Sequence, residues 1–257
     1  MYSRKNRLKQ WIAPALTFVL FISIWQLIDY LFGIRNIILP NPLEIFLIMV
    51  NNFSYLLDHT KLTAIEAISG FLLGSILGIA SAILFTYSKL VKNSLYPYTI
   101  AFKAIPVIAL APLLIMWFGS GVTSKIVMAA IITYFPVLVG TVKGLSAVTK
   151  DHLDLFRSLS ASNWNIFWKL RFPTSLPYLF PSLKISATFA VVGATIAEFT
   201  GASKGIGYII VNSSYYLETT MMFAAIVMIS IFGVLFFYLI DLLEKKIVFW
   251  HGKTEIS

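Results

Sequence analysis

Residues 151–177 read DHLDLFRSLSASNWNIFWKLRFPTSLP and lie between two long apolar segments. They form the longest interior stretch that is polar enough to face water and patterned enough to fold. Thr149 can cap a first short helix, with Asp151 and Asp154 in its opening turn, where the helix dipole favours anions. The polar run SASN at 160–163 ends that helix and offers the cap of a second one. We therefore expect two short helices joined by a bend.

The second helix has an apolar face and a basic last turn. Its apolar positions are Trp164, Phe167, Trp168 and Leu170. Lys169 and Arg171 fall in the last turn, where cations suit the helix dipole. Pro173 and Pro177 are expected to end the helix. At a membrane surface, such a pair offers a structure that another protein can bind. The alternative is an amphipathic helix pair that lies on the bilayer.

The composition places the whole chain among membrane proteins. Hydrophobic residues make up 58% and charged residues 12%, and the mean hydropathy is +0.84, which is too apolar for a soluble domain. A formal charge of +9 could indicate nucleic-acid binding, but in a membrane protein it indicates basic residues that hold loops in the cytoplasm. Without cysteine, the chain has neither disulfides nor thiol chemistry.

Six membrane spans are predicted. Residues 1–11 form a basic cytoplasmic tail, and the apolar run at 11–32 is longer than the core of a signal peptide and lacks a small-x-small cleavage site. Each predicted span is close to the ~20 residues that a bilayer requires. The spans are 11–32, 62–86, 95–118, 126–142, 182–200 and 221–243. Pro106 and Pro112 predict kinks in the third. The predicted fold is an all-α polytopic membrane protein with both ends in the cytoplasm (N-in/C-in).

The connecting segments belong to this single domain of residues 1–257. We expect an external segment at 33–61, a cytoplasmic loop at 145–177 and a cytoplasmic tail at 244–257. In the external segment, Asn41 as cap, Pro42 at the first helical position and Glu44 behind it predict a short helix. The apolar run that follows is too short to cross a bilayer, so this helix is expected to lie along the outer surface.

The distribution of basic residues supports the predicted topology. Of the 20 Lys and Arg residues, the topology places only Arg35, Lys61, Lys125 and Lys204 outside. The excess inside is the positive-inside pattern. The same pattern puts the loop at 145–177 in the cytoplasm.

The loop also keeps the spacing of a known motif, E-A-A-x3-G-x9-I-x-L-P. The motif positions fall on Asp154, Leu155, Phe156, Ser160, Leu170, Phe172 and Pro173. Asp replaces Glu, two bulky residues replace the alanines, and Ser160 replaces the glycine that makes the bend. With this spacing the chain resembles the inner-membrane permease subunits of bacterial ABC importers.

Two further segments resemble the same family. Residues 39–42 read LPNP, and the family often has two prolines one residue apart at this place. Residues 190–208 contain a small-residue run, then Ala197 and Glu198, then Gly205 and Gly207. This order is similar to permeases that handle nitrate, taurine, other sulfonates, and thiamine or riboflavin precursors.

The resemblance implies the fold of a type I ABC importer permease that acts as a homodimer or with a similar permease. Two copies of a cytoplasmic ATP-binding subunit would hydrolyse ATP, and an external binding protein would deliver the solute at the bacterial cytoplasmic (inner) membrane. ATP-driven closure would pull the short helices together and rock the spans from inward-facing to outward-facing. The implied solute is a small anion, such as a sulfonate, taurine or nitrate, or a vitamin precursor. The implied ATPase-coupling residues are Asp154, Ser160, Ala161, Trp164, Phe167, Trp168, Leu170 and Pro173.

Acidic residues inside spans are candidates for the translocation path, because burying a charge in a membrane is costly. Glu66 and Glu198 are the acidic candidates here, and Thr195, on the same helix as Glu198, is a further candidate. The alternative for Glu66 is a side chain that reaches the outer interface, and for Glu198 a helix-end acid that accepts hydrogen bonds from turn amides.

Gly70, Gly74 and Gly78 recur at four-residue spacing. Small residues on one face let two helices approach closely, so we expect helix packing within or between subunits there.

The sequence favours no enzymatic function and no cofactor. Gly252-Lys253-Thr254 resembles the end of a phosphate-binding loop, but Ile247 replaces the required first glycine. ATP hydrolysis is therefore expected in a separate subunit. His59, His152 and His251 fall on both sides of the membrane, which excludes a shared metal site in this topology. The Asp151 and Asp154 pair fits helix-start electrostatics better than acid–base catalysis.

Two other classes of function remain as alternatives. An ion-coupled secondary transporter or channel would commonly carry ionisable residues near mid-membrane and internal repeats. Here Asp29, Glu66 and Glu198 lie near the ends of the predicted spans. A membrane-anchored scaffold would leave the proline kinks and the small-residue faces unexplained.

Overall fold

The computed structural model describes residues 4–250, with the side chains of 12–99, 101 and 104–250, and these residues are helical throughout their regular structure. Residues 1–3 and 251–257, which include His251 and the Gly252-Lys253-Thr254 sequence, lie outside the described residues, and the expected basic tail at 1–11 is helical from Arg4. The elements are α1 (Arg4–Phe32), α2 (Pro42–Asn51), α3 (Phe53–Tyr87), α4 (Lys89–Lys103), α5 (Val107–Phe118), α6 (Val122–Leu145), α7 (Lys150–Ser158), α8 (Asn163–Ile166), the π-helical turn η1 (Phe167–Arg171), α9 (Phe172–Glu198), α10 (Ile206–Tyr215) and α11 (Thr219–Ile247).

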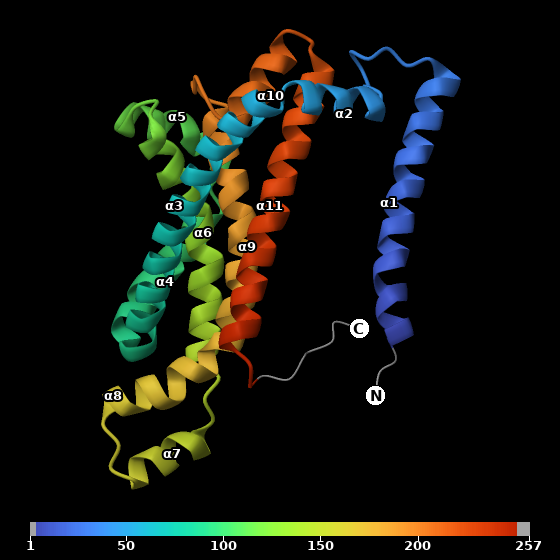
Figure 1. The fold of residues 1–257 in the computed structure, drawn as a ribbon. Coiled ribbons are helices and arrows are strands. Elements are labelled where there is room, and N and C mark those ends of the chain that lie inside the picture. The colour runs from blue at the N-terminus through green and yellow to red at the C-terminus, as the bar shows by residue number, and fades with distance from the viewer. Residues whose placement is uncertain (1–3, 251–257) are drawn as a thin grey trace.

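Five helical segments of the described chain are long and apolar enough to cross a membrane. They are Ile12–Phe32, Phe53–Tyr87, Val122–Leu145, Asn163–Glu198 and Thr219–Ile247. The third predicted span, 95–118, is wrong as a single helix, because it is divided between α4 and α5. Pro106 lacks a backbone N–H and disfavours the helical conformation of Ile105, so the helix breaks at 104–106. Together α4 and α5 run from the lower to the upper end of the bundle (Figure 1).

The core consists of α3, α6 and α9, which pack along most of their lengths. A Cβ atom added to Gly70, Gly74 or Gly78 of α3 would lie 2.7, 2.5 or 2.9 Å from a backbone oxygen of α6. These glycines therefore allow α3 and α6 to approach within one subunit. Gly144 of α6 makes a similar approach to Ser175 of α9, where an added Cβ would lie 2.8 Å from the Ser175 Cα.

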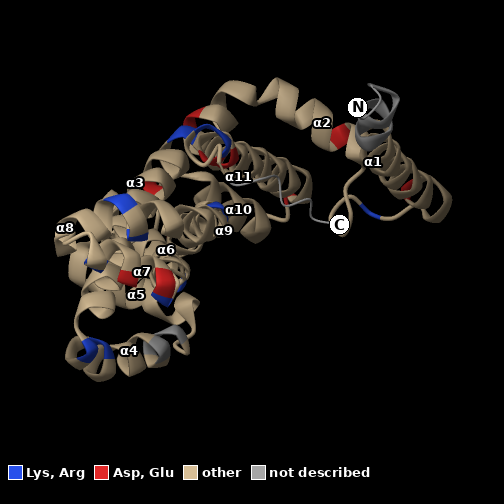
Figure 2. Ribbon diagram, turned by 90° about the horizontal axis from the view of Figure 1, so that it is seen from below, with Lys and Arg blue, Asp and Glu red and all other residues tan. Residues whose placement is uncertain are grey.

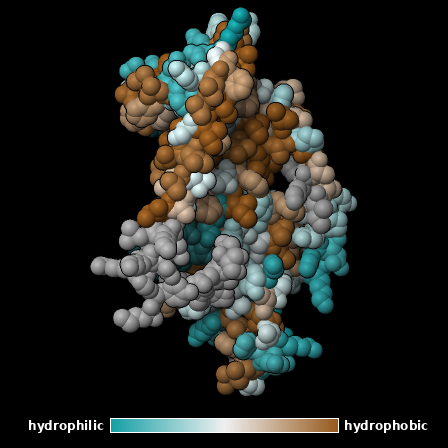
Figure 3. Space-filling view, turned by 90° about the vertical axis from the view of Figure 1, so that its right-hand side faces the viewer, coloured by the Kyte–Doolittle hydropathy of each residue, from teal (hydrophilic) through white to brown (hydrophobic). Residues whose placement is uncertain are grey.

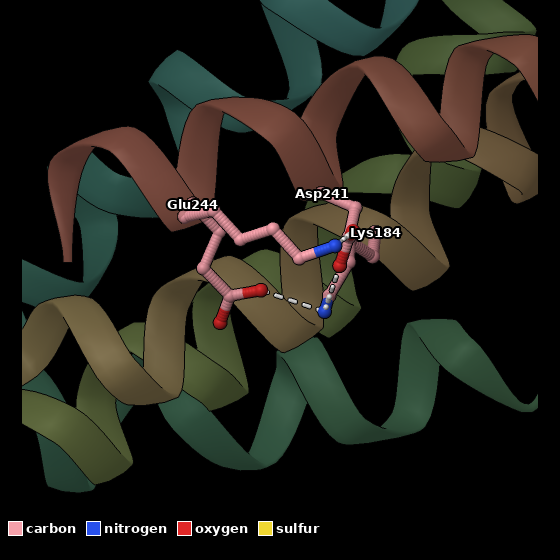
Figure 4. Close-up of polar contacts among 4 residues, drawn as sticks. Lys184, Asp241 and Glu244 are labelled. Carbon is pink, nitrogen blue, oxygen red and sulfur yellow. Dashed lines mark hydrogen bonds and ion pairs between the residues drawn. The ribbon is translucent and has the colours of Figure 1, made fainter. Parts of the chain in front are cut away.

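The lower end of α11 is joined to α9 by ion pairs. The Lys184 ammonium of α9 lies 3.1 Å from Asp241 and 2.6 Å from Glu244 of α11 (Figure 4). Lys245 also pairs with Asp241, at 2.5 Å. Lys184, Asp241 and Glu244 are only 16–22% exposed, so this network fixes the two helices to each other more firmly than a surface pair would.

The outer and peripheral helices cover the ends and one side of the bundle. Asn41 caps α2 by accepting a hydrogen bond from the Leu43 amide at 2.8 Å, which confirms the predicted start. The helix α2 lies across the upper end, while α1 stands apart from the bundle and contacts it through Trp25 and Phe223, whose ring centroids are 5.8 Å apart (Figure 1).

Polar residues gather toward the ends of the molecule. In the side view of Figure 3, hydrophilic residues lie at the top and toward the bottom, with a hydrophobic band below the top. Seen from below, the charged residues occur singly or in small groups along a ribbon that is mostly uncharged (Figure 2). The start of α1 and the end of α11 lie toward the end that carries α7 and α8 (Figure 1). This arrangement fits a chain that crosses a bilayer.

Candidate functional site

The helix α7 projects below the bundle and buries none of its residues (Figure 1). Its predicted cap is confirmed, because the Thr149 hydroxyl accepts a hydrogen bond from the His152 amide. Asp154 forms an exposed ion pair with Arg157 at 3.3 Å. An exposed pair of this kind stabilises a helix little, so Asp154 remains available to a partner.

The bend after α7 is built around Ser160, the residue at the motif's glycine position. Its φ is +55°, in the left-handed region that glycine adopts most easily. The Ser160 amide donates to Arg157 O at 2.9 Å, and the Ala161 amide donates to Phe156 O at 3.0 Å. These two bonds form a Schellman motif, whose left-handed position is usually glycine. The chain thus makes the glycine bend with a serine.

Pro173 and Pro177 were expected to end the second short helix, and this prediction is wrong. The helix continues into the membrane bundle. Ser162 caps α8, accepting from the Asn165 amide at 3.3 Å. The π-helical turn η1 follows, in which the Phe172 amide bonds to Phe167 O. Pro173 then occupies the start of α9, where its missing N–H costs little, and Pro177 lies inside α9. One helical path therefore joins α8 to α9.

The three candidate aromatic residues divide into a buried and an exposed group. Phe167 is 8% exposed, and its ring centroid lies 6.2 Å from that of Tyr87 at the end of α3. Trp164 is 70% and Trp168 45% exposed, and their rings lie 5.5 Å apart. Phe167 therefore anchors the loop to the bundle, while the two tryptophans face outward.

Arg171 is a second residue that anchors the loop to the bundle. The sequence indicated it only as a cation in the last turn of the second short helix. Its guanidinium donates to Leu145 O, the last residue of α6, at 3.0 Å and lies 5.8 Å from the centroid of the Tyr87 ring. A helix-terminal carbonyl is a frequent partner of Arg. Tyr87 was also missed, because no local pattern links α3 to residues 80 positions later.

The exposed apolar side chains of the loop form what we call the loop surface. Its members are Leu155, Leu159, Trp164 and Trp168. Exposed apolar patches rimmed by polar residues mark sites of protein or membrane interaction. Leu170 and Pro173 are half-buried beside the loop surface, and Ala161 lies at the bend between its two helices.

At the upper end of the bundle, Glu198 is buried and fully hydrogen-bonded. One carboxylate oxygen accepts from the Thr63 hydroxyl at 2.6 Å, and the other accepts from the Gly207 amide at 2.6 Å. The Thr63 hydroxyl also accepts from the Ile206 amide at 2.9 Å. This cluster joins α3, α9 and the first turn of α10. Thr63 was missed, although it lies three residues before Glu66 and so on the same helix face.

The other candidate path residues lie nearby but are also enclosed. Glu66 is 2% exposed, and its Oε2 has no partner among the described residues. Thr195 is 9% exposed and donates to Val191 O. Lys125, which the predicted topology places on the external side of the membrane, is not on the subunit's surface: it is 2% exposed and donates to Ser120 O. Glu66, Thr195 and Glu198 therefore lie inside the subunit, and a role on the path stays a prediction.

Comparisons with known proteins identify the family. Residues 70–249 match the family model described as "Binding-protein-dependent transport system inner membrane component". The chain is 32% identical over 250 residues to a formylaminopyrimidine transport permease protein of Halalkalibacterium halodurans, covering 96% of this chain and 99% of that protein. It is 31% identical over 247 residues to a putative aliphatic sulfonates transport permease protein of Bacillus subtilis, covering 95% and 90%.

A solved structure has the same fold. The match is to an inward-facing conformation of the MetNI methionine ABC transporter, with a TM-score of 0.67 at 18% identity, and it covers 75% of this chain and 95% of that chain. The sequence matches and the fold agree, and the chain therefore belongs to the family of binding-protein-dependent ABC transporter inner-membrane permeases.

Proposed function

We propose that this importer permease works as a homodimer, with a cytoplasmic ATPase bound at each loop surface. The family implies an ATPase subunit and a binding protein. In the proposed topology both chain ends and α7–α8 lie in the cytoplasm of a bacterium, and α2 and α10 face the external binding protein. The observation that carries the proposal is the exposed loop surface, which is held rigidly by Phe167 and Arg171.

The proposed contact residues have separate roles. Trp164 and Trp168 dock into the ATPase, and Asp154 offers it a charged contact. Ser160 and Ala161 set the bend, and Phe167, Leu170 and Pro173 brace the loop against the spans. Exposed aromatic residues held on a rigid element are the usual source of binding energy at protein interfaces.

The helical path from α8 through η1 into α9 supports a mechanical link. Because α9 packs on α6, a displacement of α8 by the ATPase would move α9 and α6 with it, without a flexible joint between them. Closure of two ATPases would bring the two loops together and turn the spans from inward-facing to outward-facing.

The proposed solute is a small molecule delivered by the binding protein. Relatives named for formylaminopyrimidine and for aliphatic sulfonates are about equally similar to this chain, so both a vitamin precursor and a small anion fit. Glu66, Thr195 and Glu198 remain candidates for the path. An ion-coupled secondary transporter or channel is the competing function, and a test of ATPase binding separates the two.

The test is co-purification of the permease with its ATPase from detergent. Wild type is expected to bring down the ATPase in a two-plus-two complex, whereas Trp164→Glu and Asp154→Lys are expected to lose it. Trp250→Glu is the matched control, because Trp250 is 47% exposed and lies outside the loop. ATPase binding that survives both loop substitutions would refute the proposed contact.

A further inference from the structure

A cavity of about 1100 Å³ opens between the broken helix pair α4–α5 and the core helices α6 and α9. Residues on both sides of the break line it, among them Tyr98 and Thr99 of α4 and Val107 and Leu110 of α5. Its volume is slightly above the usual range for small-molecule sites in proteins. Neither Glu66 nor Glu198 lines the cavity, so it is separate from the cluster at the upper end.

The break in the backbone indicates what the cavity faces. Ala104, Ile105 and Pro106 are not α-helical and are exposed, and Ile105 lines the cavity. Backbone groups outside a helix cannot face lipid, because hydrocarbon offers them no hydrogen bond. Such a break is tolerated at membrane depth only against protein or a water-filled space. A break at membrane depth would therefore place this opening against protein or water rather than against lipid.

On the opposite side of the cavity, prolines of the core helices interrupt the helical hydrogen bonding. Pro136 of α6 and Pro177 and Pro181 of α9 all line the cavity. Each removes one helical hydrogen bond and leaves a carbonyl of the preceding turn without its usual donor. In secondary transporters, discontinuous and proline-interrupted helices form the solute site, because their free backbone groups can bind a solute. The proline-interrupted walls of this cavity offer the same kind of backbone group.

The lining is aromatic and carries little charge. Six aromatic side chains contribute to it, namely Phe85, Tyr98, Tyr134, Phe135, Tyr178 and Phe189. Hydroxyl groups come from the three tyrosines, Thr99 and Ser182, and a positive charge comes from Lys143, whose ammonium lies 5.8 Å from the Tyr178 ring centroid. The described lining includes no Asp or Glu.

We propose that this cavity is part of the solute path and takes a flat heteroaromatic solute that is neutral or carries one negative charge. The inference rests on the proposed function and selects between its two solute classes. A flat ring gains stacking and edge contacts with the aromatic walls. A small sulfonate would lose its hydration to a mainly apolar lining, in which Lys143 is the one charged side chain among the described residues, so its transfer is costly.

The absence of cysteine from the chain allows a direct test. Ser182 of α9 lines the cavity, and its hydroxyl donates to Tyr178 O four residues earlier. Ser230 of α11 is exposed outside the cavity, and its hydroxyl donates to Ile226 O in the same way. Ser182→Cys and Ser230→Cys are thus a matched pair, one in the proposed path and one on the outer surface of the bundle.

The pair is treated with a charged methanethiosulfonate reagent in the membrane-embedded complex with its ATPase, without nucleotide, and modification is followed by intact mass. Only a thiolate reacts, and it forms in water but not in lipid. We expect Ser182→Cys to react on the order of 10 times faster than Ser230→Cys. Equal rates would mean that lipid or the second permease copy fills the cavity, which would overturn the proposal.

The solute class is tested by protection of the same site. Riboflavin and 4-amino-5-hydroxymethyl-2-methylpyrimidine serve as heteroaromatic probes, and taurine as the sulfonate probe. We expect at least one heteroaromatic probe to slow the modification of Ser182→Cys by about threefold or more, as occupancy of most sites would, and taurine to leave it unchanged. Any other pattern of protection overturns the solute class. ATPase co-purification, measured on the same preparations, reports separately on the proposed function.

Discussion

At the scale of single residues, the loop depends on a serine in a glycine conformation. Ser160 has a φ of +55° and closes the Schellman motif after α7. A side chain in this region costs about 1 kcal/mol relative to glycine, so the bend stores strain that the family's usual residue would not.

Ser160→Gly is therefore expected to stabilise the α7–α8 bend by about 0.5–1 kcal/mol. Hydrogen exchange of the amides at 156–162 should become slower. Ser158→Gly is the matched control, because Ser158 is helical and the same substitution there should destabilise α7 by about 0.5–1 kcal/mol. Faster exchange in Ser160→Gly would contradict the proposed strain.

Glu198 is also a residue-scale feature, because its two oxygens accept hydrogen bonds from different segments. In Glu198→Gln the amide oxygen can still accept from the Gly207 amide, but the NH2 group then faces the Thr63 hydroxyl, which must turn its proton to His59 O at 3.2 Å, and the charged acceptor is lost. We expect a loss of about 1–3 kcal/mol in stability. Thermal unfolding of Glu198→Gln, Thr63→Val and the double variant should show strong non-additivity. Unchanged stability with loss of transport would instead assign Glu198 to the solute path.

At the level of helices, the starts that depend on neighbouring residues could be predicted from the sequence. Helix continuation and helix breaks, which depend on distant packing, could not. Capping residues marked the starts of α2, α7 and α8 correctly, because a cap depends on neighbours in sequence. The continuation of α8 into α9 was missed. The π-helical turn η1 precedes Pro173 and places it at the start of α9, where its missing N–H does not stop the helix. The break between α4 and α5 was expected only as a kink, since the strength of a proline break depends on packing.

Substitutions in the α8–η1 segment are expected to affect either the stability of the permease or its binding to the ATPase, according to whether the side chain is buried or exposed. Phe167→Ala removes a buried ring and should destabilise the permease by about 3 kcal/mol. Trp164→Ala alters an exposed ring and should leave thermal unfolding nearly unchanged while weakening ATPase binding about tenfold or more. Unfolding and ATPase titration on the two variants distinguish these effects. If Trp164→Ala bound the ATPase as wild type does, the docking role would be lost.

At the scale of the whole molecule, composition and hydropathy sufficed for the class and for most of the spans. The pairing of α3 with α6 through Gly70, Gly74 and Gly78 also follows from a visible small-residue pattern, although the pattern does not name the partner helix. The clusters around Glu198 and around Arg171 could not be predicted, because each joins residues that are far apart in sequence.

The proposed topology predicts different accessibility at the two ends. Ser214 is an exposed residue of α10 at the upper end, and Ser146 is an exposed residue after α6 at the lower end. In intact cells a membrane-impermeant thiol reagent should label Ser214→Cys at once and Ser146→Cys only after permeabilisation. The reverse order would invert the topology and place the loop surface outside the cell.

The most direct test of the account is solute uptake by the permease reconstituted with its ATPase and binding protein. We predict uptake that requires ATP and the binding protein, continues when ion gradients are dissipated, and is lost in Trp164→Glu but retained in Trp250→Glu. Uptake by the permease alone, driven by an ion gradient and unaffected by Trp164→Glu, would contradict the account and indicate a secondary transporter.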